Sequence, residues 1–287
     1  MPATVVGTVS DLRRYPVKSM LGEQLQRAWL TERGVDGDRT YALVDDETGK
    51  VISVKRPKRW GRMFELTAST TDDGVRVSFP DGAAFAIDDR CLAERLSEFF
   101  GRSVSVATTP PPDYGYDEVW SADLKEGAPP YPGAASQVIE EEEFIDGGGF
   151  MAAQGNFFDF GAIHLITTAS TKQLTEFAPE SRFDPHRFRP NVVVDTPARG
   201  FIETAWQGRS LAVGDAGLTV GIPVPRCVMT TLAQGDLPAD RNVLRTISEH
   251  HGVDFLSVGT RYPCVGVYAD VTTPGEIALG DQVLLEE

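Results

Sequence analysis

Short stretches of alternating apolar and polar residues, separated by turn-forming residues, run through most of this 287-residue chain. Residues 40–46 and 51–56 flank one turn-forming stretch, and residues 75–79 and 84–87 flank another that contains an Asp-Gly pair. Pairs of this kind predict β-hairpins. Many short strands joined by Gly- and Pro-containing turns favour a small barrel or sandwich over a doubly wound parallel sheet.

Helices are expected at only a few places. Apolar residues recur at helical spacing, with suitable residues at the ends, in segments 91–101, 168–177 and 239–252. Cys91 opens the first of them, and we expect it to be buried in the core. Apolar runs at 160–167 and 188–196 predict strands. Segments 210–222 and 276–286 repeat one pattern, in which a Gly-Asp pair joins two alternating runs as a tight turn.

Charge and composition limit the partners of the chain. The formal net charge of −15 argues against a nucleic-acid partner. No segment approaches the roughly 18 uninterrupted apolar residues of a membrane span, and the first residues do not form a signal peptide. Three cysteines are too few for a disulfide framework, so a reduced, cytoplasmic setting is expected. The basic residues cluster, and such clusters suit an anionic small molecule: Arg13, Arg14, Lys18, Lys55, Arg56, Lys58, Arg59, Arg62, Arg182, Arg187 and Arg189.

Cys227 is the cysteine with the most reactive sequence context. Pro223 and Pro225 stiffen the chain before it, and the neighbouring Arg226 favours a thiolate. A thiolate is a nucleophile or a soft metal ligand. The alternative, a buried core cysteine, stays open from these local features. Cys264 has no activating neighbour, and His164 lies in a predicted strand as a hydrogen-bonded core imidazole.

Several motifs, taken together, match a known family. The blocks are Arg14-Tyr-Pro-Val-Lys-Ser19, Gly34-Val-Asp-Gly-Asp-Arg-Thr-Tyr-Ala-Leu43, Phe188-Arg-Pro-Asn191, Asp215 after a glycine, and Arg226-Cys-Val-Met-Thr-Thr231. In order and spacing the chain resembles MOSC-domain proteins that carry an N-terminal MOSC β-barrel module, including the mitochondrial amidoxime-reducing component and its bacterial counterparts. The implied fold is strand-rich α+β, with a barrel-like module at 1–108, an irregular acidic, Gly- and Pro-rich connector at 109–158, and a MOSC β-barrel with a few helices at 159–287.

The resemblance implies a molybdenum cofactor, a phosphate-bearing pyranopterin dithiolene whose metal takes one protein cysteine. By motif, Cys227 is the expected molybdenum ligand and catalytic residue. The residues expected to bind the rest of the cofactor are Lys18, Ser19, Arg39, Phe160, Gly161, Arg189, Asn191 and Arg226. Lysine and arginine donors suit its anionic groups. The relatives have small polar residues where Phe160 and Gly161 align, so backbone contacts are expected there.

The implied activity is reduction of N-oxygenated small molecules by a molybdenum oxidoreductase. The sequence has no flavin or nicotinamide fingerprint and too few cysteines for an iron–sulfur cluster, so electrons are expected from a separate donor protein. The acidic run 140–143 is one candidate docking element for such a donor, and a solvated acidic loop is the interpretation that the segment favours when taken alone. Two alternatives are a sulfurtransferase that uses a Cys227 persulfide and a non-catalytic carrier of the cofactor. Pyridoxal phosphate binding is a family-level association to which no residue is assigned.

Overall fold

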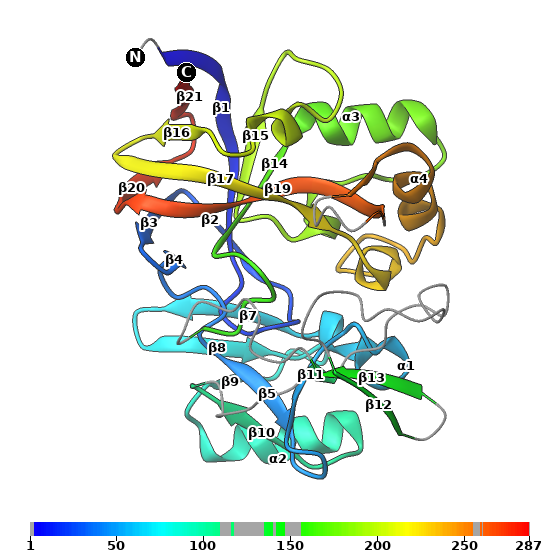
Figure 1. Ribbon diagram of the computed structural model, residues 1–287. Coiled ribbons are helices and arrows are strands. Elements are labelled where there is room, and N and C mark those ends of the chain that lie inside the picture. The colour runs from blue at the N-terminus through cyan, green and yellow to red at the C-terminus, as the bar shows by residue number, and fades with distance from the viewer. Residues whose placement is uncertain are drawn as a thin grey trace. The chain divides into compact units, whose positions relative to one another are not determined.

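The computed structural model describes residues 3–109, 116–117, 135–139, 142–146, 156–254, 259 and 261–286 (Figure 1). The chain forms two compact units, and both are discontinuous in sequence. The first unit comprises Met1–Arg14, Gln24–Asp36 and Phe160–Glu287, and the second comprises Tyr15–Glu23 and Gly37–Asp159. The first strand of the chain therefore belongs with the C-terminal half. The predicted boundaries at 108 and 158 stay a prediction.

The first unit is built on a closed barrel of seven strands. Around the ring, each strand is hydrogen-bonded to the next, and β14 closes the ring by pairing with β19. In order, the strands are β14 (Ile163–Thr167), β15 (Val192–Asp195), β1 (Ala3–Arg14), β21 (Gln282–Glu286), β16 (Ser210–Val213), β17 (Ala216–Pro225) and β19 (Tyr262–Thr273). All neighbouring pairs are antiparallel except β14 and β15, which run parallel.

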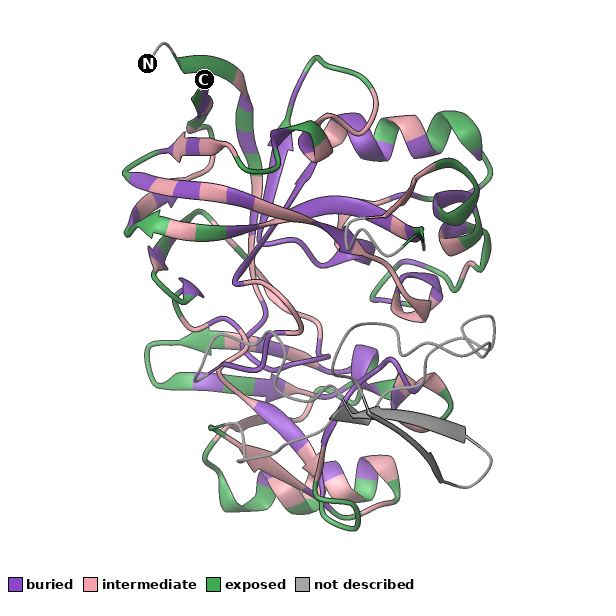
Figure 2. Cartoon of the chain, viewed as in Figure 1, coloured by how far each residue is buried: buried purple, intermediate pink, exposed green. Residues whose placement is uncertain are grey.

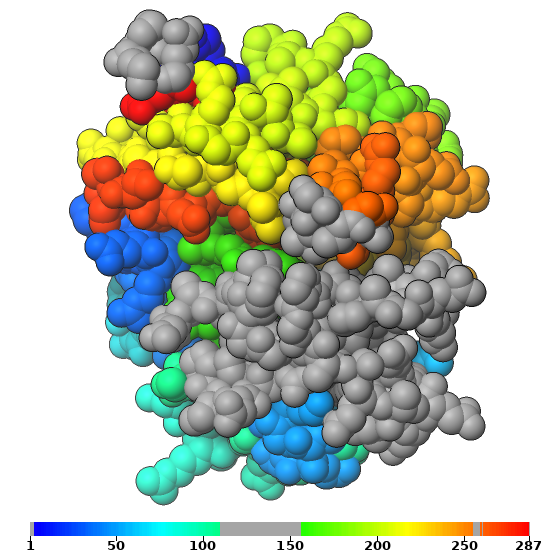
Figure 3. All heavy atoms as spheres, in the orientation of Figure 1, coloured from blue at the N-terminus to red at the C-terminus, as the bar shows by residue number. Residues whose placement is uncertain are grey.

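Side-chain alternation explains why these segments close into a barrel. Along β17, Ala216, Leu218 and Val220 are buried, whereas the residues between them are partly exposed, as the banding in Figure 2 shows. One face of each strand thus supplies the core, as a half-exposed antiparallel strand requires. Val9 and Leu12 from β1 join the same hydrophobic cluster as residues of β14, β17 and β19. In Figure 3 the β16–β17 hairpin, drawn in yellow, forms a continuous band on the surface of this unit.

Smaller elements complete the first unit. They are the strands β2 (Glu23–Leu25), β3 (Arg27–Thr31), β4 (Gly34–Val35), β18 (Gly252–Val253) and β20 (Gly275–Ala278), the helices α3 (Thr168–Phe177) and α4 (Asn242–His250), and the 3-10 turns η3 (Pro185–Phe188), η4 (Ile202–Trp206) and η5 (Val228–Thr231). Thr167 caps α3 by accepting a hydrogen bond from the Ser170 amide at 3.3 Å. Both α3 and α4 pack against a second cluster around Ile166, Leu174 and Ile247.

The described part of the second unit contains small sheets and two α-helices. Its elements are β5 (Ala42–Asp45), β6 (Lys50–Ile52), α1 (Pro57–Trp60), η1 (Gly61–Glu65), β7 (Thr67–Thr71), β8 (Gly74–Ser78), β9 (Ala84–Ala86), α2 (Arg90–Phe100), β10 (Val104–Ala107), β11 (Tyr116–Asp117), β12 (Ala135–Ile139) and β13 (Glu142–Asp146). The sheets have the orders β7-β8-β9, β10-β5-β6-β11 and β12-β13. The last pair lies inside the segment expected to be an irregular connector. Residues 140 and 141 of the acidic run lie outside the described residues.

The expected fold class is confirmed, and one expected burial is wrong. The structure is strand-rich with a closed barrel, and the hairpins β5–β6 and β8–β9 and the helices α2, α3 and α4 form where the sequence predicts them. Cys91, however, is exposed. It lies in the first turn of α2, whose buried face consists of Leu92, Leu96 and Phe99, so its side chain points to solvent.

Candidate functional site

Cys227 lies at a corner of the first unit, between the end of β17 and the start of η5. Its carbonyl oxygen accepts hydrogen bonds from the Thr230 amide at 3.2 Å and from Thr230 Oγ1 at 3.0 Å. Pro223 and Pro225 lack amide donors, and the β17–β19 register shifts at both of them. The thiol is half-buried. Strand termination at the prolines thus places Cys227 where a ligand can reach it.

Arg226 fastens this corner to the barrel. Its Nε donates to the Val265 carbonyl at 2.9 Å, and its Nη1 donates to the Phe188 carbonyl at 3.0 Å. Its Nη2 donates to His164 Nε2 and also to the Val265 carbonyl. Burial lowers the pKa of Arg226 to about 10, although the nearby Tyr268, Cys264 and Cys227 oppose this shift. A planar guanidinium holds its N–H donors in a fixed geometry. These hydrogen bonds therefore fix the position of Arg226, the residue directly before Cys227.

Asn191 cross-links three segments of the barrel. Its Oδ1 accepts from the His164 amide at 3.1 Å, and its Nδ2 donates to the Arg13 carbonyl at 3.2 Å. Its own amide donates to the His164 carbonyl at 2.8 Å. Arg189, two residues earlier, is buried and has a positive φ of 55° at the end of η3. Asn191 therefore holds the strand that follows Arg189 in register with β14. His164 is buried and hydrogen-bonded, as predicted.

Gly161 permits a close approach that no other residue would allow. A Cβ atom added there would lie 2.7 Å from the ring of Tyr268 on β19. The neighbouring Phe160 stacks on the same ring, with 6.2 Å between ring centroids. The aligned position must therefore be glycine in this chain. This contact accounts for the glycine at 161, and it does not bear on the other departure from the resemblance, at Phe160.

Three predicted ligands lie in the second unit. Ser19 and Arg39 both have positive φ angles, 65° and 48°, which non-glycine residues rarely adopt. Ser19 Oγ accepts from the Val54 amide at 3.3 Å, and Arg39 pairs with Asp38. Burial lowers the pKa of Arg39, but Asp38 and other nearby acidic groups outweigh burial and raise it. Strained backbone that the surrounding structure holds in place is frequent at ligand sites.

Lys18 lies in one cluster with Asp159 and Lys55, two residues that the sequence motifs did not identify as site residues. Its Nζ donates to Asp159 Oδ1 and to the Phe157 carbonyl at 3.1 Å. Lys55 Nζ lies 3.2 Å from Asp159 Oδ2. Lys55 belongs to a basic cluster that composition alone reveals. Asp159 directly precedes the predicted ligand Phe160, but its pairing with two lysines more than 100 residues away depends on tertiary structure.

The predicted residues thus form two groups. Lys18, Ser19 and Arg39 belong to the second unit. Phe160, Gly161, Arg189, Asn191, Arg226 and Cys227 belong to the first, where His164 connects Asn191 to Arg226. That both groups surround one ligand stays a prediction. Among the described residues, no cluster of three His, Cys, Asp or Glu side chains could hold a metal ion. No helix in those parts of the chain is long and apolar enough to span a bilayer.

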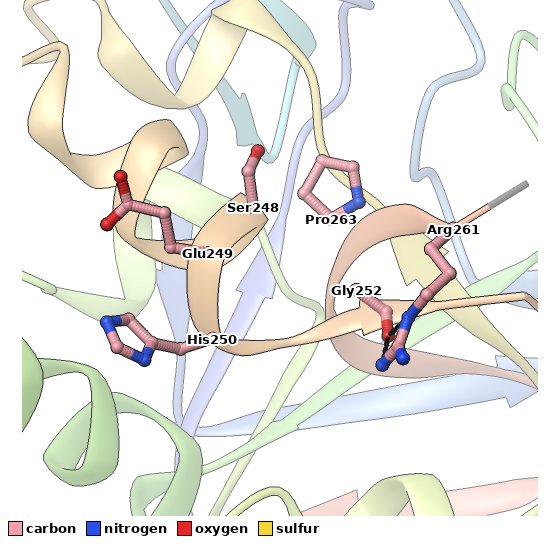
Figure 4. Close-up of a pocket in the computed structure, with 6 residues that line it drawn as sticks. All are labelled: Ser248, Glu249, His250, Gly252, Arg261 and Pro263. Carbon is pink, nitrogen blue, oxygen red and sulfur yellow. Dashed lines mark hydrogen bonds between the residues drawn. The ribbon is translucent and has the colours of Figure 1, made fainter.

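A pocket elsewhere in the first unit has polar walls. Ser248, Glu249 and His250 line it from the end of α4, with Gly252, Arg261 and Pro263 opposite, as Figure 4 shows. Arg261 Nε donates to the Gly252 carbonyl at 2.8 Å, and Glu249 pairs with Arg245 at 3.0 Å. Arg261 and Glu249 thus form contacts within α4 and just after its end. None of the predicted site residues lines this pocket.

Glu203 gives the first unit a testable pH dependence. It is fully buried and accepts hydrogen bonds from Thr167 Oγ1 at 2.7 Å and Ser170 Oγ at 2.6 Å. Burial raises its pKa above the ordinary 4.5, and the hydroxyl donors only partly offset that rise. In the unfolded chain the carboxyl ionises near its ordinary pKa, whereas the folded protein keeps the proton to higher pH. Stability from this group is thus lost as pH rises from about 4.5 toward the folded-state pKa.

We expect Glu203→Gln to remove that pH dependence. Urea unfolding of wild type and variant at about pH 4.5 and about pH 7.5 measures it, because the other carboxyl groups cancel in the difference. The free energy of unfolding of the variant minus that of wild type should be larger at the higher pH. An equal difference at both pH values would show that Glu203 does not keep its proton in the folded protein.

Two family models match the chain, in the order that the sequence motifs predict. The MOSC N-terminal beta barrel domain matches residues 6–108, and the MOSC domain matches residues 153–284. Together they cover most of the chain, including every predicted site residue. The chain therefore belongs to the family of proteins that join a MOSC N-terminal barrel domain to a MOSC domain.

Individual proteins are similar to the chain over most of its length. The chain is 29% identical to mitochondrial amidoxime reducing component 2 of Bos taurus, over 97% of this chain and 83% of that protein. It is 24% identical to mitochondrial amidoxime-reducing component 1 of Homo sapiens, over 98% and 83%. Among solved structures, the YuaD protein of Bacillus subtilis is 10% identical with a TM-score of 0.42, over 99% of this chain and 98% of that one.

Proposed function

We propose that this protein is a molybdenum-cofactor oxidoreductase that reduces N-oxygenated small molecules with electrons from a separate donor protein. One observation carries the proposal: a half-buried thiol, Cys227, follows a guanidinium that the barrel holds rigidly at four hydrogen bonds. The match to MOSC models and the similarity to proteins named amidoxime-reducing components support it.

The other two cysteines are poor candidates for a metal ligand. Cys264 is completely buried, and burial raises the pKa of its thiol to about 12 despite the nearby Arg226. Cys91 is exposed on α2 of the second unit. A thiolate is the form that binds metal, so a thiol that resists ionisation is inert. Cys91 also follows an arginine, Arg90, but it belongs to the second unit, whereas Cys227 is accessible in the first unit and lies in the motif that the family resemblance assigns to the metal.

The chemistry of the donor groups fits the cofactor. Molybdenum coordinated by sulfur prefers a soft thiolate, which Cys227 supplies. A phosphate monoester prefers ammonium and guanidinium donors, which Lys18, Arg39 and Arg189 supply. Each of these cationic side chains is largely buried, so a bound anion would be only weakly screened by solvent.

The chain's own residues then have distinct tasks. When bound, the cofactor supplies two-electron removal of oxygen from the substrate's N–O group. Cys227 holds the metal, and Lys18, Arg39 and Arg189 hold anionic groups. Asn191 bonds to His164 and Arg13, and Arg226 bonds to Val265 and Phe188, so we assign both side chains to positioning. Arg226 fixes the corner that presents Cys227, and Asn191 fixes the strand that follows Arg189.

We expect the purified protein to reduce an N-hydroxylated amidine when reduced methyl viologen supplies electrons, and not when NADH is the only reductant. The sequence has no nicotinamide or flavin fingerprint, so NADH needs an intermediary protein. Amidine formation followed by chromatography measures turnover. Turnover with NADH alone, in protein free of contaminating reductase, would contradict the requirement for a donor protein. A Cys227 persulfide without metal would instead favour a sulfurtransferase, and cofactor bound without turnover would favour a carrier.

A further inference from the structure

Asp159 bridges the ammonium groups of two buried lysines in the second unit. One carboxylate oxygen accepts from Lys18, and the other lies 3.2 Å from Lys55 Nζ. The side chains of Lys18 and Lys55 are 6% and 9% exposed, whereas that of Asp159 is 29% exposed. The carboxylate is therefore the solvent-facing member of the three. An anion that arrives from solvent meets Asp159 before it meets either lysine.

The bridge is strongly electrostatic. Burial alone would raise the pKa of Asp159, but Lys18 and Lys55 reverse this and hold that pKa far below its usual range. Asp159 is thus a carboxylate at every physiological pH. Charge-assisted pairs of this kind are short and strong when partly buried, and their loss leaves buried charge uncompensated.

A short segment carries Asp159 to the predicted ligands. The Phe157 amide donates to the Arg39 carbonyl at 2.9 Å, and the Phe158 ring lies 5.6 Å from the Arg39 guanidinium carbon. Both phenylalanines are buried. The segment 156–159 is therefore anchored beside Arg39 and Lys18, and it ends with its carboxylate on the two lysines.

We propose that Lys18 and Lys55 form a binding site for a phosphate monoester, and that Asp159 is its internal counter-anion, which covers the site until phosphate displaces it. The inference rests on the proposed function, in which the cofactor carries that phosphate. No covalent step is involved: a carboxylate with one negative charge and two acceptor oxygens exchanges for a phosphate dianion with three. Removal of the internal competitor should strengthen phosphate binding, whereas removal of Lys55 should weaken it.

The experiment uses full-length protein made in a host that cannot synthesise the cofactor, with inorganic phosphate as the probe. Phosphate is titrated at constant ionic strength against chloride, and the rise in melting temperature gives an apparent Kd. We expect Asp159→Asn to lower that Kd about tenfold or more relative to wild type, because a nearby negative charge is gone. Lys55→Met in the Asp159→Asn background should cancel the gain. Glu65→Gln is the matched control, since Glu65 pairs with Arg62 at the exposed surface of the same unit.

Equal or weaker phosphate binding by Asp159→Asn would overturn the inference and make Asp159 a positioning residue for the lysines. If that variant folds only with phosphate present, the result supports the inference. If it does not fold at all, a carbon-detected NMR titration of wild type decides: the Asp159 carboxyl resonance should move with the same midpoint as the melting temperature, and an unmoved resonance contradicts displacement. If wild type from a host that makes the cofactor retains molybdenum, but Asp159→Asn binds phosphate no more tightly, only this inference is refuted. If Asp159→Asn binds phosphate more tightly, but wild type from the cofactor-producing host holds no molybdenum, only the proposed function is refuted.

Discussion

We expect Cys227→Ser to lower the rate of N-hydroxylated substrate reduction at least about a hundredfold, because the hydroxyl is a poor ligand for a soft metal. Serine is nearly isosteric with cysteine, and Cys227 is only half-buried, so the free energy of unfolding should change by less than about 0.5 kcal/mol. Steady-state assay with reduced methyl viologen, together with a melting curve, measures both effects.

The other cysteines provide matched controls for this variant. Cys91→Ser changes an exposed thiol on α2 and should leave activity and stability unchanged. Cys264→Ser places a hydroxyl at a fully buried position, so it should lower the melting temperature without removing the chemistry. Undiminished activity in Cys227→Ser would contradict both the oxidoreductase proposal and the sulfurtransferase alternative.

Arg226→Met should lower the stability of the protein by about 2–3 kcal/mol. Two effects oppose each other. Removal of a partly buried cation relieves its desolvation, which is what lowers the pKa of Arg226 to about 10. Against this, the carbonyls of Val265 and Phe188 and the ring of His164 lose their donor. Each buried acceptor left unsatisfied costs about 1–3 kcal/mol, so the losses exceed the gain.

Urea unfolding measures this loss, and two further variants interpret it. Arg226→Lys keeps the charge but cannot reproduce the geometry of the guanidinium donors, so it should be nearly as unstable as Arg226→Met. Arg245→Met removes an exposed partner of Glu249 on α4 and should change stability by less than about 0.5 kcal/mol. If Arg226→Met is as stable as wild type, the hydrogen bonds of the guanidinium are not what holds the Cys227 corner in place.

Local patterns predicted local structure well. The β8–β9 hairpin depends on an Asp-Gly turn, and α2 ends at Gly101, both of which the sequence predicted; the cap residue Asp89 was not predicted. The partner of β1 could not be predicted in this way. This strand pairs with β15 and β21, about 180 and 270 residues away, and no nearby turn specifies that register.

In the site, too, sequence neighbours were predictable and contacts between distant segments were not. Cys227 and Arg226 are neighbours in sequence, so a short motif identifies both of them. The partners of Arg226 cannot be found in this way, because His164 and Val265 come from other strands of the barrel. Asp159 was missed for a similar reason. It follows a segment without a strong pattern, and its bridge to Lys18 and Lys55 exists only after that segment has packed beside Arg39.

Cofactor content tests most directly whether Cys227 holds a molybdenum cofactor. Wild type and Cys227→Ser are to be produced in a host that synthesises the cofactor, and metal analysis is combined with fluorescence of the oxidised pterin. We expect molybdenum and pterin to co-purify with wild type in equal amounts, approaching about one of each per chain, and Cys227→Ser to lose molybdenum. Wild-type protein with neither metal nor pterin, from a host that loads another molybdenum enzyme in the same culture, would contradict it.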